Sequence, residues 1–150
     1  AVNELGFIDR AGVREVLGRS VAGLVTLHPT PNYIDALPVK MFEYMSAALP
    51  VIASDFPLWR SIIDSAGCGL LVDPRDPRAI ARAMRWIIEH PQEAHAMGQR
   101  GRAAVLARYN WEGEFPKLPQ LYNCLLNAGR STPGTQSGIA MAPPYRRGAA

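Results

Sequence analysis

Short apolar runs alternate with segments of helical period over the first half of the chain. Runs of strand length predict strands at 23–28, 51–54 and 69–72, and the intervening pattern predicts helices at 11–19, 38–48 and 57–65. Such alternation is typical of an α/β fold in which a parallel sheet is covered by helices on both faces. Because right-handed crossovers bring the strand-to-helix loops to one edge, we expect ligands to bind at the carboxyl edge of the sheet.

Two further helices are predicted after the last strand. The first begins at Pro77 and ends at Glu89-His90-Pro91. Its core-facing stripe consists of apolar residues at helical spacing, namely Ile80, Ala83, Met84, Ile87 and Ile88. The second helix covers 92–108, where Gly98 and Gly101 each cost up to about 1 kcal/mol of helix propensity. We therefore expect the second helix to be locally weak.

The end of the chain has a different pattern. Residues 111–126 suit a helix that Pro116 and Pro119 interrupt, so no continuous helix is expected before Pro119. Residues 127–150 are rich in Gly, Ser, Pro and Ala without an apolar period, which predicts a disordered tail. The chain opens without a methionine or a Gly-rich loop, so we expect it to begin inside a domain. The predicted organisation is one partial domain over 1–126 and a tail over 127–150.

Composition and charge narrow the class of function. The chain has 150 residues, of which 48% are hydrophobic and 19% charged, an ordinary balance for one soluble globular domain. Its net charge of +3 comes from basic residues spread along the chain without a compact basic tract, as on a solvated surface; attraction to an anionic membrane surface or a phosphorylated substrate is the alternative. Nucleic acid is not an expected partner, because no basic tract interleaves with aromatic residues. No apolar stretch reaches the roughly 20 residues of a membrane span.

Cysteine and histidine positions argue against several kinds of chemistry. Cys68 and Cys124 lie far apart and belong to no spaced ligand set, which favours a reduced, cytosolic setting. His28, His90 and His95 have no metal-ligand spacing, so no metal site is expected. No serine lies in a Gly-x-Ser-x-Gly elbow, so a hydrolytic triad has no support.

The most informative pair is Asp35 and Glu43, eight positions apart before the apolar run at 51–54. Pro38 suits the first turn of a helix and disfavours helix before it, which puts Asp35 in the loop and Glu43 about a turn and a half into the helix. The first-turn N–H groups between them offer a seat for phosphate. Two ordinary explanations remain open: an acid that caps the helix, and a Glu43 that shares a helix face with Lys40.

The surrounding residues resemble the donor-binding domain of family 4 (group 1) glycosyltransferases. That family carries a Glu-x7-Glu element followed by a run such as Glu43-Tyr-Met-Ser-Ala-Ala-Leu-Pro-Val-Ile-Ala53. The segments Cys68-Gly-Leu-Leu-Val-Asp-Pro74, Met97-Gly-Gln-Arg-Gly-Arg102 and Tyr109-Asn-Trp111 follow in the family's order. The resemblance spans roughly residues 1–126, and it is specific as a set of motifs. It implies a Rossmann-like parallel sheet that is the incomplete carboxyl-terminal half of a two-domain GT-B architecture.

The resemblance also implies roles for individual residues. Glu43 would bind the ribose hydroxyls of the nucleotide, and Asp35 would meet hydroxyls of the transferred sugar. Backbone N–H groups of Leu37, Val39 and Lys40 would approach the diphosphate; the Lys40 side chain either adds charge there or faces solvent. Asn32 and Tyr33, expected in the same loop, either touch donor or acceptor or only pack the loop. No residue is assigned with certainty to catalysis.

Two residues depart from the family pattern. Asp35 stands where Glu is usual, which shortens the carboxylate by one methylene group. Ala48 stands where Gly is expected after the helix. Because a side chain disfavours positive φ, we expect Ala48 to avoid that conformation and the turn before Pro50 to be reshaped.

The resemblance implies a retaining glycosyltransferase that moves a sugar from a nucleotide-diphosphate sugar to a glycan, lipid or other glycoconjugate, without a metal or other cofactor. This chain would supply most of the donor-binding domain, with the acceptor domain and basic diphosphate clamp missing, so the 150-residue fragment alone is expected to be inactive. The alternative is a non-catalytic nucleotide-sugar-binding remnant or one subunit of a split transferase. The expected location is the cytoplasm, with peripheral association at the inner membrane face left open.

Overall fold

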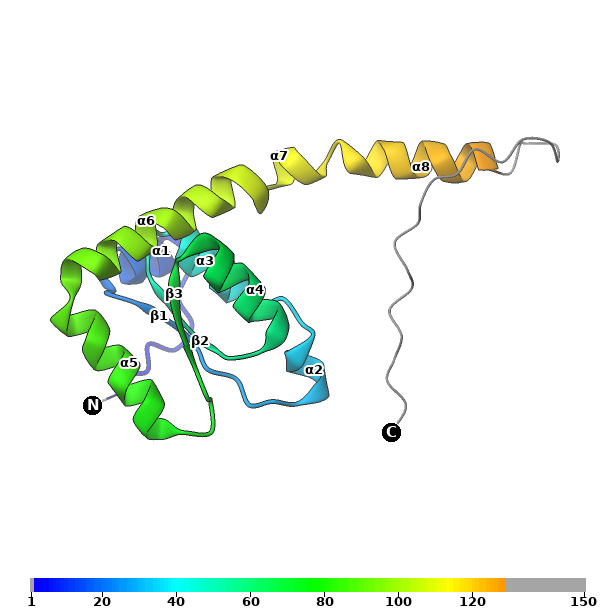
Figure 1. The fold of residues 1–150 in the computed structure, drawn as a ribbon. Helices are drawn as coiled ribbons and strands as arrows, with labels where there is room; N and C mark the ends of the chain where they lie inside the picture. Colours follow the sequence, from blue (N-terminus) through cyan, green and yellow to red (C-terminus); the bar gives the residue numbers. More distant parts are fainter. Residues whose placement is uncertain (1, 129–150) are drawn as a thin grey trace. The chain divides into compact units, whose positions relative to one another are not determined.

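The computed structural model describes residues 2–128, and the chain divides into two compact units, Ala1–Glu114 and Phe115–Ala150. The described part of the first unit contains a three-stranded parallel sheet in the order β1-β2-β3 (Figure 1). The strands are β1 (Gly23–Val25), β2 (Val51–Ser54) and β3 (Gly69–Val72). The predicted β2 and β3 have the expected bounds, whereas β1 is shorter than predicted and ends before the loop to His28.

Helices lie between and after the strands as the pattern predicts. The helices of the first unit are α1 (Arg10–Arg19), α2 (Pro31–Ile34), α3 (Val39–Ser46), α4 (Pro57–Ala66), α5 (Pro77–Glu89), α6 (Pro91–Arg108) and α7 (Trp111–Glu114). Figure 1 shows the strands between α5 on one side and α3 and α4 on the other. The predicted fold class, a Rossmann-like parallel sheet covered on both faces, is confirmed.

Alternation along the central strand β2 creates the two cores. Val51 and Ala53 join a buried cluster with side chains of α3 and α4, while Ile52 joins a second cluster with Ala83 and Ile87 of α5. This is the period of two expected for a strand, and all four β2 residues are buried. A strand buried on both faces holds the loops at its carboxyl end on a rigid base.

The predicted core stripe of α5 is correct for some residues and wrong for others. Ala83 and Ile87 are buried and Ile80 is partly buried, but Met84 is 44% and Ile88 67% exposed. The single layer of strands under α5 can cover only a narrow stripe of the helix. Apolar side chains at the border of the stripe therefore remain in contact with solvent.

The turn after α3 contradicts the expectation for Ala48. Ala48 adopts φ +58°, the left-handed conformation that glycine favours, so the turn is not reshaped to avoid positive φ. Its N–H donates to the Met45 carbonyl, and the N–H of Leu49 donates to the Tyr44 carbonyl at 2.9 Å. These two bonds form a Schellman motif, which satisfies the last carbonyls of the helix. The same motif ends α4 with Gly67 at φ +60°.

The glycines of α6 explain why the strained turn persists. α6 is continuous from Pro91 to Arg108, and both Gly98 and Gly101 are buried. A Cβ at Gly98 would overlap the carbonyl oxygen of Ala48, and a Cβ at Gly101 would lie 3.1 Å from Cys68 Cβ. The two glycines therefore lower the helix propensity of α6, but they allow α6 to pack closely on the end of α3.

The second unit is described over Phe115–Ala128, where α8 (Lys117–Ala128) is the helix. Its Pro119 lies in the first turn, where the missing N–H removes no helical bond. The helical pattern is interrupted before Lys117, as Pro116 predicts, but the expected interruption at Pro119 is wrong, because α8 begins two residues before it. Asn127 belongs to α8 and not to a disordered tail, and the rest of the predicted tail, 129–150, lies outside the described residues.

Candidate functional site

Asp35 lies at the carboxyl edge of the sheet, in the loop that joins α2 to α3. It is the C-cap residue of the four-residue helix α2, with φ −102° and ψ 3°, and its side chain is exposed. Asn32 and Tyr33 lie within α2 and not in the loop where they were expected. The sequence pattern was too short to reveal this helix, because the Pro29-Thr-Pro31 signal favours a turn equally well.

A hydrogen bond links the loop after Asp35 to α4. Trp59 of α4 is completely buried, and its indole Nε1–H donates a hydrogen bond of 2.7 Å to the carbonyl of Ala36. In a similar way, the hydroxyl of buried Ser54 donates to the Leu27 carbonyl at 2.7 Å. Sequence analysis assigned neither residue a role. The available signal was a tryptophan within an apolar helix, since a buried indole N–H needs an acceptor.

Three backbone N–H groups are free at the start of α3. Pro38 is the N-cap residue at φ −74° and has no side-chain cap; the prediction that it opens the helix is correct to within one residue. Val39 and Lys40 follow in the first turn, where N–H groups have no intrahelical acceptor. In the described part of the chain, neither these two nor Leu37 donates its N–H to a carbonyl outside the helix. The helix dipole adds partial positive charge at the same place.

Glu43 lies on the solvent side of α3. Met41 and Met45, two positions to either side, are completely buried, so helical geometry turns Glu43 away from the core. The ordinary explanation that Glu43 pairs with Lys40 fails, because within residues 2–128 Glu43 takes part in no ion pair. Burial raises the pKa of the neighbouring Tyr44 hydroxyl, and the charge of Glu43 adds to the rise.

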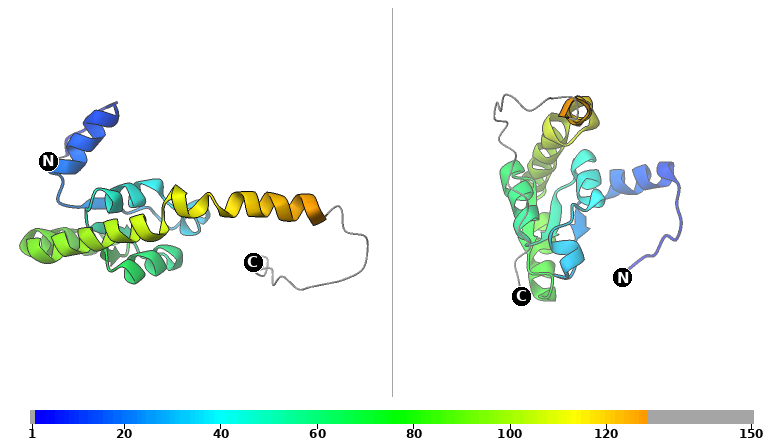
Figure 2. Two further views of the ribbon diagram at one scale, coloured as in Figure 1. Left: turned by 90° about the horizontal axis from the view of Figure 1, so that it is seen from above. Right: turned by 90° about the vertical axis from the view of Figure 1, so that its right-hand side faces the viewer.

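Two surface hollows meet at Glu43. One of about 280 Å³ lies between α1 and β1 and also includes Tyr44 and Leu17. The other, of about 410 Å³, is lined by Val39, Glu43 and Tyr109 among others. The helix α1, which has no buried residue, projects from the layer formed by α3, and this arrangement leaves the hollows open (Figure 2). An exposed carboxylate at the meeting point of two hollows is available to polar ligands.

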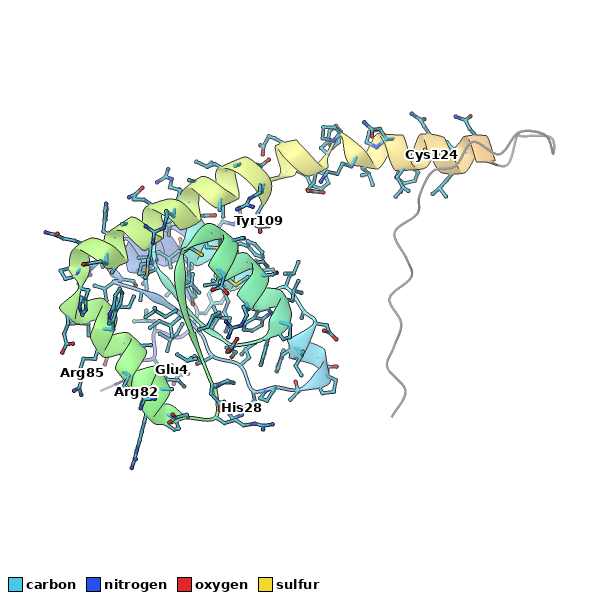
Figure 3. All side chains as sticks on the ribbon, in the orientation of Figure 1. Glu4, His28, Arg82, Arg85, Tyr109 and Cys124 are labelled. Carbon is cyan, nitrogen blue, oxygen red and sulfur yellow. The ribbon has the colours of Figure 1, made fainter. Side chains whose placement is uncertain are left out.

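Two aromatic residues, Phe42 and Tyr109, line part of the larger hollow. Tyr109 lies at the end of α6 (Figure 3). Its ring packs on that of Phe42 of α3, with ring centroids 5.1 Å apart and planes tilted by 54°. The side chain of Arg108 lies over the Tyr109 ring at 5.8 Å. Sequence analysis placed Tyr109 in a motif but gave it no function. Its separation from Phe42 in the chain conceals the contact.

The structure brings some of the predicted site residues together. Leu37, Val39 and Lys40 surround the start of α3, and Val39 shares the larger hollow with Glu43. With a rise of about 1.5 Å per residue, Val39 and Glu43 differ by about 6 Å along the axis. Asp35 lines neither hollow. Asp35 therefore precedes α3, whereas Glu43 lies within it beside the two hollows.

Other candidate chemistry finds little structural basis in residues 2–128. No group of three or more His, Cys, Asp and Glu side chains is arranged to hold a metal ion there. Cys68 is buried and free, and burial raises the pKa of its thiol to about 11, so it stays protonated and unreactive at neutral pH. Cys124 is free and exposed. Among the helices of this part of the chain, none combines the length and apolar character needed to cross a membrane.

Similar proteins place this arrangement in a family. The chain is 33% identical over 103 residues to the D-rhamnosyltransferase WbpZ of Pseudomonas aeruginosa, covering 68% of this chain and 26% of that protein. It is 29% identical over 107 residues to the lipopolysaccharide core biosynthesis mannosyltransferase LpcC of Rhizobium leguminosarum, covering 71% and 30%. It is also 29% identical over 128 residues to the D-inositol 3-phosphate glycosyltransferase of Corynebacterium urealyticum, covering 81% and 30%. The chain thus spans less than a third of the length of these relatives.

The fold comparison agrees with the sequence relatives. Sucrose-phosphate synthase from Thermosynechococcus elongatus superposes with a TM-score of 0.72 at 30% identity, covering 83% of this chain and 30% of that one. Residues 1–104 match the family Glycosyl transferases group 1. This match covers more than half of the chain and shows that it belongs to the group 1 glycosyltransferases.

Proposed function

We propose that this chain supplies most of the donor-binding domain of a retaining family 4 glycosyltransferase, corresponding to the carboxyl-terminal half of a GT-B enzyme. The observation that carries the proposal is the start of α3, where the free N–H groups of Leu37, Val39 and Lys40 precede the exposed, unpaired carboxylate of Glu43. Backbone N–H groups at a helix N-terminus suit an anionic diphosphate, and an acceptor-only carboxylate suits sugar hydroxyls.

Each residue has one role in this proposal. Leu37, Val39 and Lys40 hold the diphosphate through their N–H groups, and Glu43 binds the ribose hydroxyls. Asp35, in the loop before the helix, accepts hydrogen bonds from the transferred sugar. Asn32 and Tyr33 are exposed on α2, which favours contact with donor or acceptor over internal packing of the loop.

The reaction step that these groups assist is departure of the nucleoside diphosphate. Negative charge grows on the leaving diphosphate as the bond to the sugar breaks, and the sugar becomes cation-like. Preorganised N–H donors and the positive end of α3 stabilise that charge. Asp35 orients the sugar while the acceptor hydroxyl oxygen bonds to the same carbon atom and its proton passes to the oxygen of the departing diphosphate.

The acceptor and the remaining machinery lie outside the site described above. Relatives include a lipopolysaccharide core mannosyltransferase and an inositol phosphate glycosyltransferase, so the acceptor class is a glycan, a lipid-linked glycan or another glycoconjugate. An acceptor domain and further basic residues on the diphosphate come from sequence beyond this chain. The enzyme works in the cytoplasm, at the inner face of the membrane when its acceptor is lipid-linked.

Calorimetric titration of the 150-residue chain with UDP, GDP and ADP tests the donor site. One of them should bind, and Glu43→Gln should weaken binding by about 1–1.5 kcal/mol, the difference between a charge-assisted hydrogen bond and a neutral one. Glu89→Gln, the same change at an exposed residue of α5, should leave the affinity unchanged. Equal affinity of wild type and Glu43→Gln would reject the ribose role, and no binding of any nucleotide would reject the donor site.

A turnover assay separates the enzyme from its alternatives. We expect no sugar transfer by the 150-residue chain alone, and transfer when it is joined to an acceptor domain. Transfer after mixing with a separate acceptor domain indicates a split transferase. Donor binding without transfer in either form indicates a non-catalytic binding protein and contradicts the proposed reaction.

A further inference from the structure

The indole of Trp59 makes one polar contact across a long sequence separation. Trp59 is completely buried beside Phe56, with ring centroids 4.7 Å apart. Its Nε1–H donates to the carbonyl oxygen of Ala36 at 2.7 Å, although the two residues are 23 positions apart. Packing alone does not require this N–H, since a phenylalanine ring would fill most of the same apolar space.

The segment that receives this bond has few other attachments. Ala36 follows Asp35, in the connection between the short helix α2 and α3. Its own N–H donates to the Tyr33 carbonyl at 3.3 Å, a bond that stays within the loop and α2. Among the described residues, the bond from Trp59 is therefore the hydrogen bond that links residue 36 to α4.

Because the peptide group is planar, the hydrogen bond to the Ala36 carbonyl also fixes the direction of the Leu37 N–H. The chain has no cis peptide bond in its described residues, so the C=O of Ala36 and the N–H of Leu37 lie in one plane and point in opposite directions. Trp59 holds the carbonyl toward the buried core. The N–H of Leu37 must then point away from the core, and it finds no carbonyl acceptor among residues 2–128.

We propose that Trp59 is a positioning residue, which aims the Leu37 N–H at the diphosphate by holding the Ala36 carbonyl. This inference rests on the proposed function, because it assigns Trp59 to the same donor site. Trp59 touches no ligand itself. Trp59 should therefore affect the binding of the phosphate groups and not the binding of the ribose, which Glu43 contacts further along α3.

The specific test compares the nucleoside diphosphate that binds wild type with the corresponding monophosphate. Trp59→Phe removes the N–H but keeps an aromatic ring. It should weaken the diphosphate by about threefold to tenfold, the effect of one hydrogen bond, and should weaken the monophosphate less. Phe56→Leu perturbs the neighbouring aromatic contact without touching the loop, and it should lower thermal stability while leaving the ratio of the two affinities unchanged.

The outcomes separate the two hypotheses. If wild type binds a diphosphate and Trp59→Phe leaves the ratio of affinities unchanged, the positioning role is wrong and the donor site stands. If wild type binds none of UDP, GDP and ADP, the donor site itself fails and the role of Trp59 fails with it.

A measurement on the wild type keeps the proposal testable if Trp59→Phe does not fold. The indole N–H of Trp59, whose side chain is completely buried, should exchange with solvent deuterium far more slowly than the indole N–H of free tryptophan in the same buffer. Equal exchange rates for the two indoles would show that the bond to Ala36 is absent and would overturn the proposal.

Discussion

The two edges of the sheet are built in opposite ways. At the amino edge, the turn after α3 packs against α6, with Leu49 buried, Ala48 at φ +58° and Gly98 against the Ala48 carbonyl. At the carboxyl edge, the start of α3 is open: Leu37 is 54% and Val39 72% exposed. One helix therefore has a fixed end and an open end.

This difference shows how a small domain can present a ligand site precisely. Strain at Ala48 is tolerated because surrounding packing leaves the turn no alternative. The rigid end fixes the axis of α3, and the axis fixes where its first N–H groups point. Packing at the amino edge therefore supports recognition at the carboxyl edge. Substitutions at the amino edge should change mainly the free energy of unfolding, whereas substitutions at the start of α3 should change mainly nucleotide affinity.

Ile87→Ala should cause the largest loss of stability among these variants and should have no specific effect on nucleotide binding. Ile87 is 2% exposed in the core between α5 and the sheet, so the cavity should cost about 2–5 kcal/mol of unfolding free energy. Denaturant unfolding measures this loss. Ile88→Ala, at the neighbouring 67% exposed position, should change stability by no more than about 0.5 kcal/mol. Equal losses for both variants would refute the assignment of this core.

Gly98→Ala should come next, with a loss of about 3 kcal/mol, the upper part of the usual range for overpacking. The added Cβ meets backbone atoms of Ala48, which cannot rotate away as a side chain would. Gly18→Ala is the matched control, since a Cβ at that position of α1 meets nothing within 4 Å. Thermal unfolding compares the two, and a neutral Gly98→Ala would show that α6 does not press on the turn.

Ala48→Gly should give a smaller effect of opposite sign. Glycine adopts positive φ without the steric cost that alanine bears, so we expect stability to rise by about 1 kcal/mol. Ala47→Gly, at φ −77° one residue earlier, should give no such gain. A destabilised Ala48→Gly would mean that the turn is not left-handed in solution.

The sequence predicts the sheet and most helices well because burial on both faces makes each strand a continuous apolar run. β2 and β3 are each a β-branched or leucine-rich run between turn signals, and their bounds are correct. Short elements such as α2 escape the pattern, since four residues cover barely one helical turn. The exposed Met84 and Ile88 also escape it, because periodicity shows a helix face but not how wide a surface covers it.

The sequence indicates which residues form the candidate site, but not which distant residues hold them in place. Pro38 and the apolar run after Glu43 place both acids around a helix start, and the structure has that helix. Trp59 and Gly98 support the two ends of α3 from 23 and 50 positions away from Ala36 and Ala48, as the sequence numbering shows. Such contacts depend on the folded arrangement of α4 and α6, and no local pattern encodes them. The expectation that Ala48 avoids positive φ failed for the same reason.

Amide NMR shifts during titration with the nucleoside diphosphate test the central claim most directly, because they compare the two edges in one experiment. If α3 holds the diphosphate, the largest shifts should occur at Leu37, Val39 and Lys40, with Leu49 and Ala94 at the amino edge unchanged. Largest shifts at Leu49 and Ala94, or none at the start of α3 while nucleotide binds, would contradict the proposal that α3 holds the diphosphate.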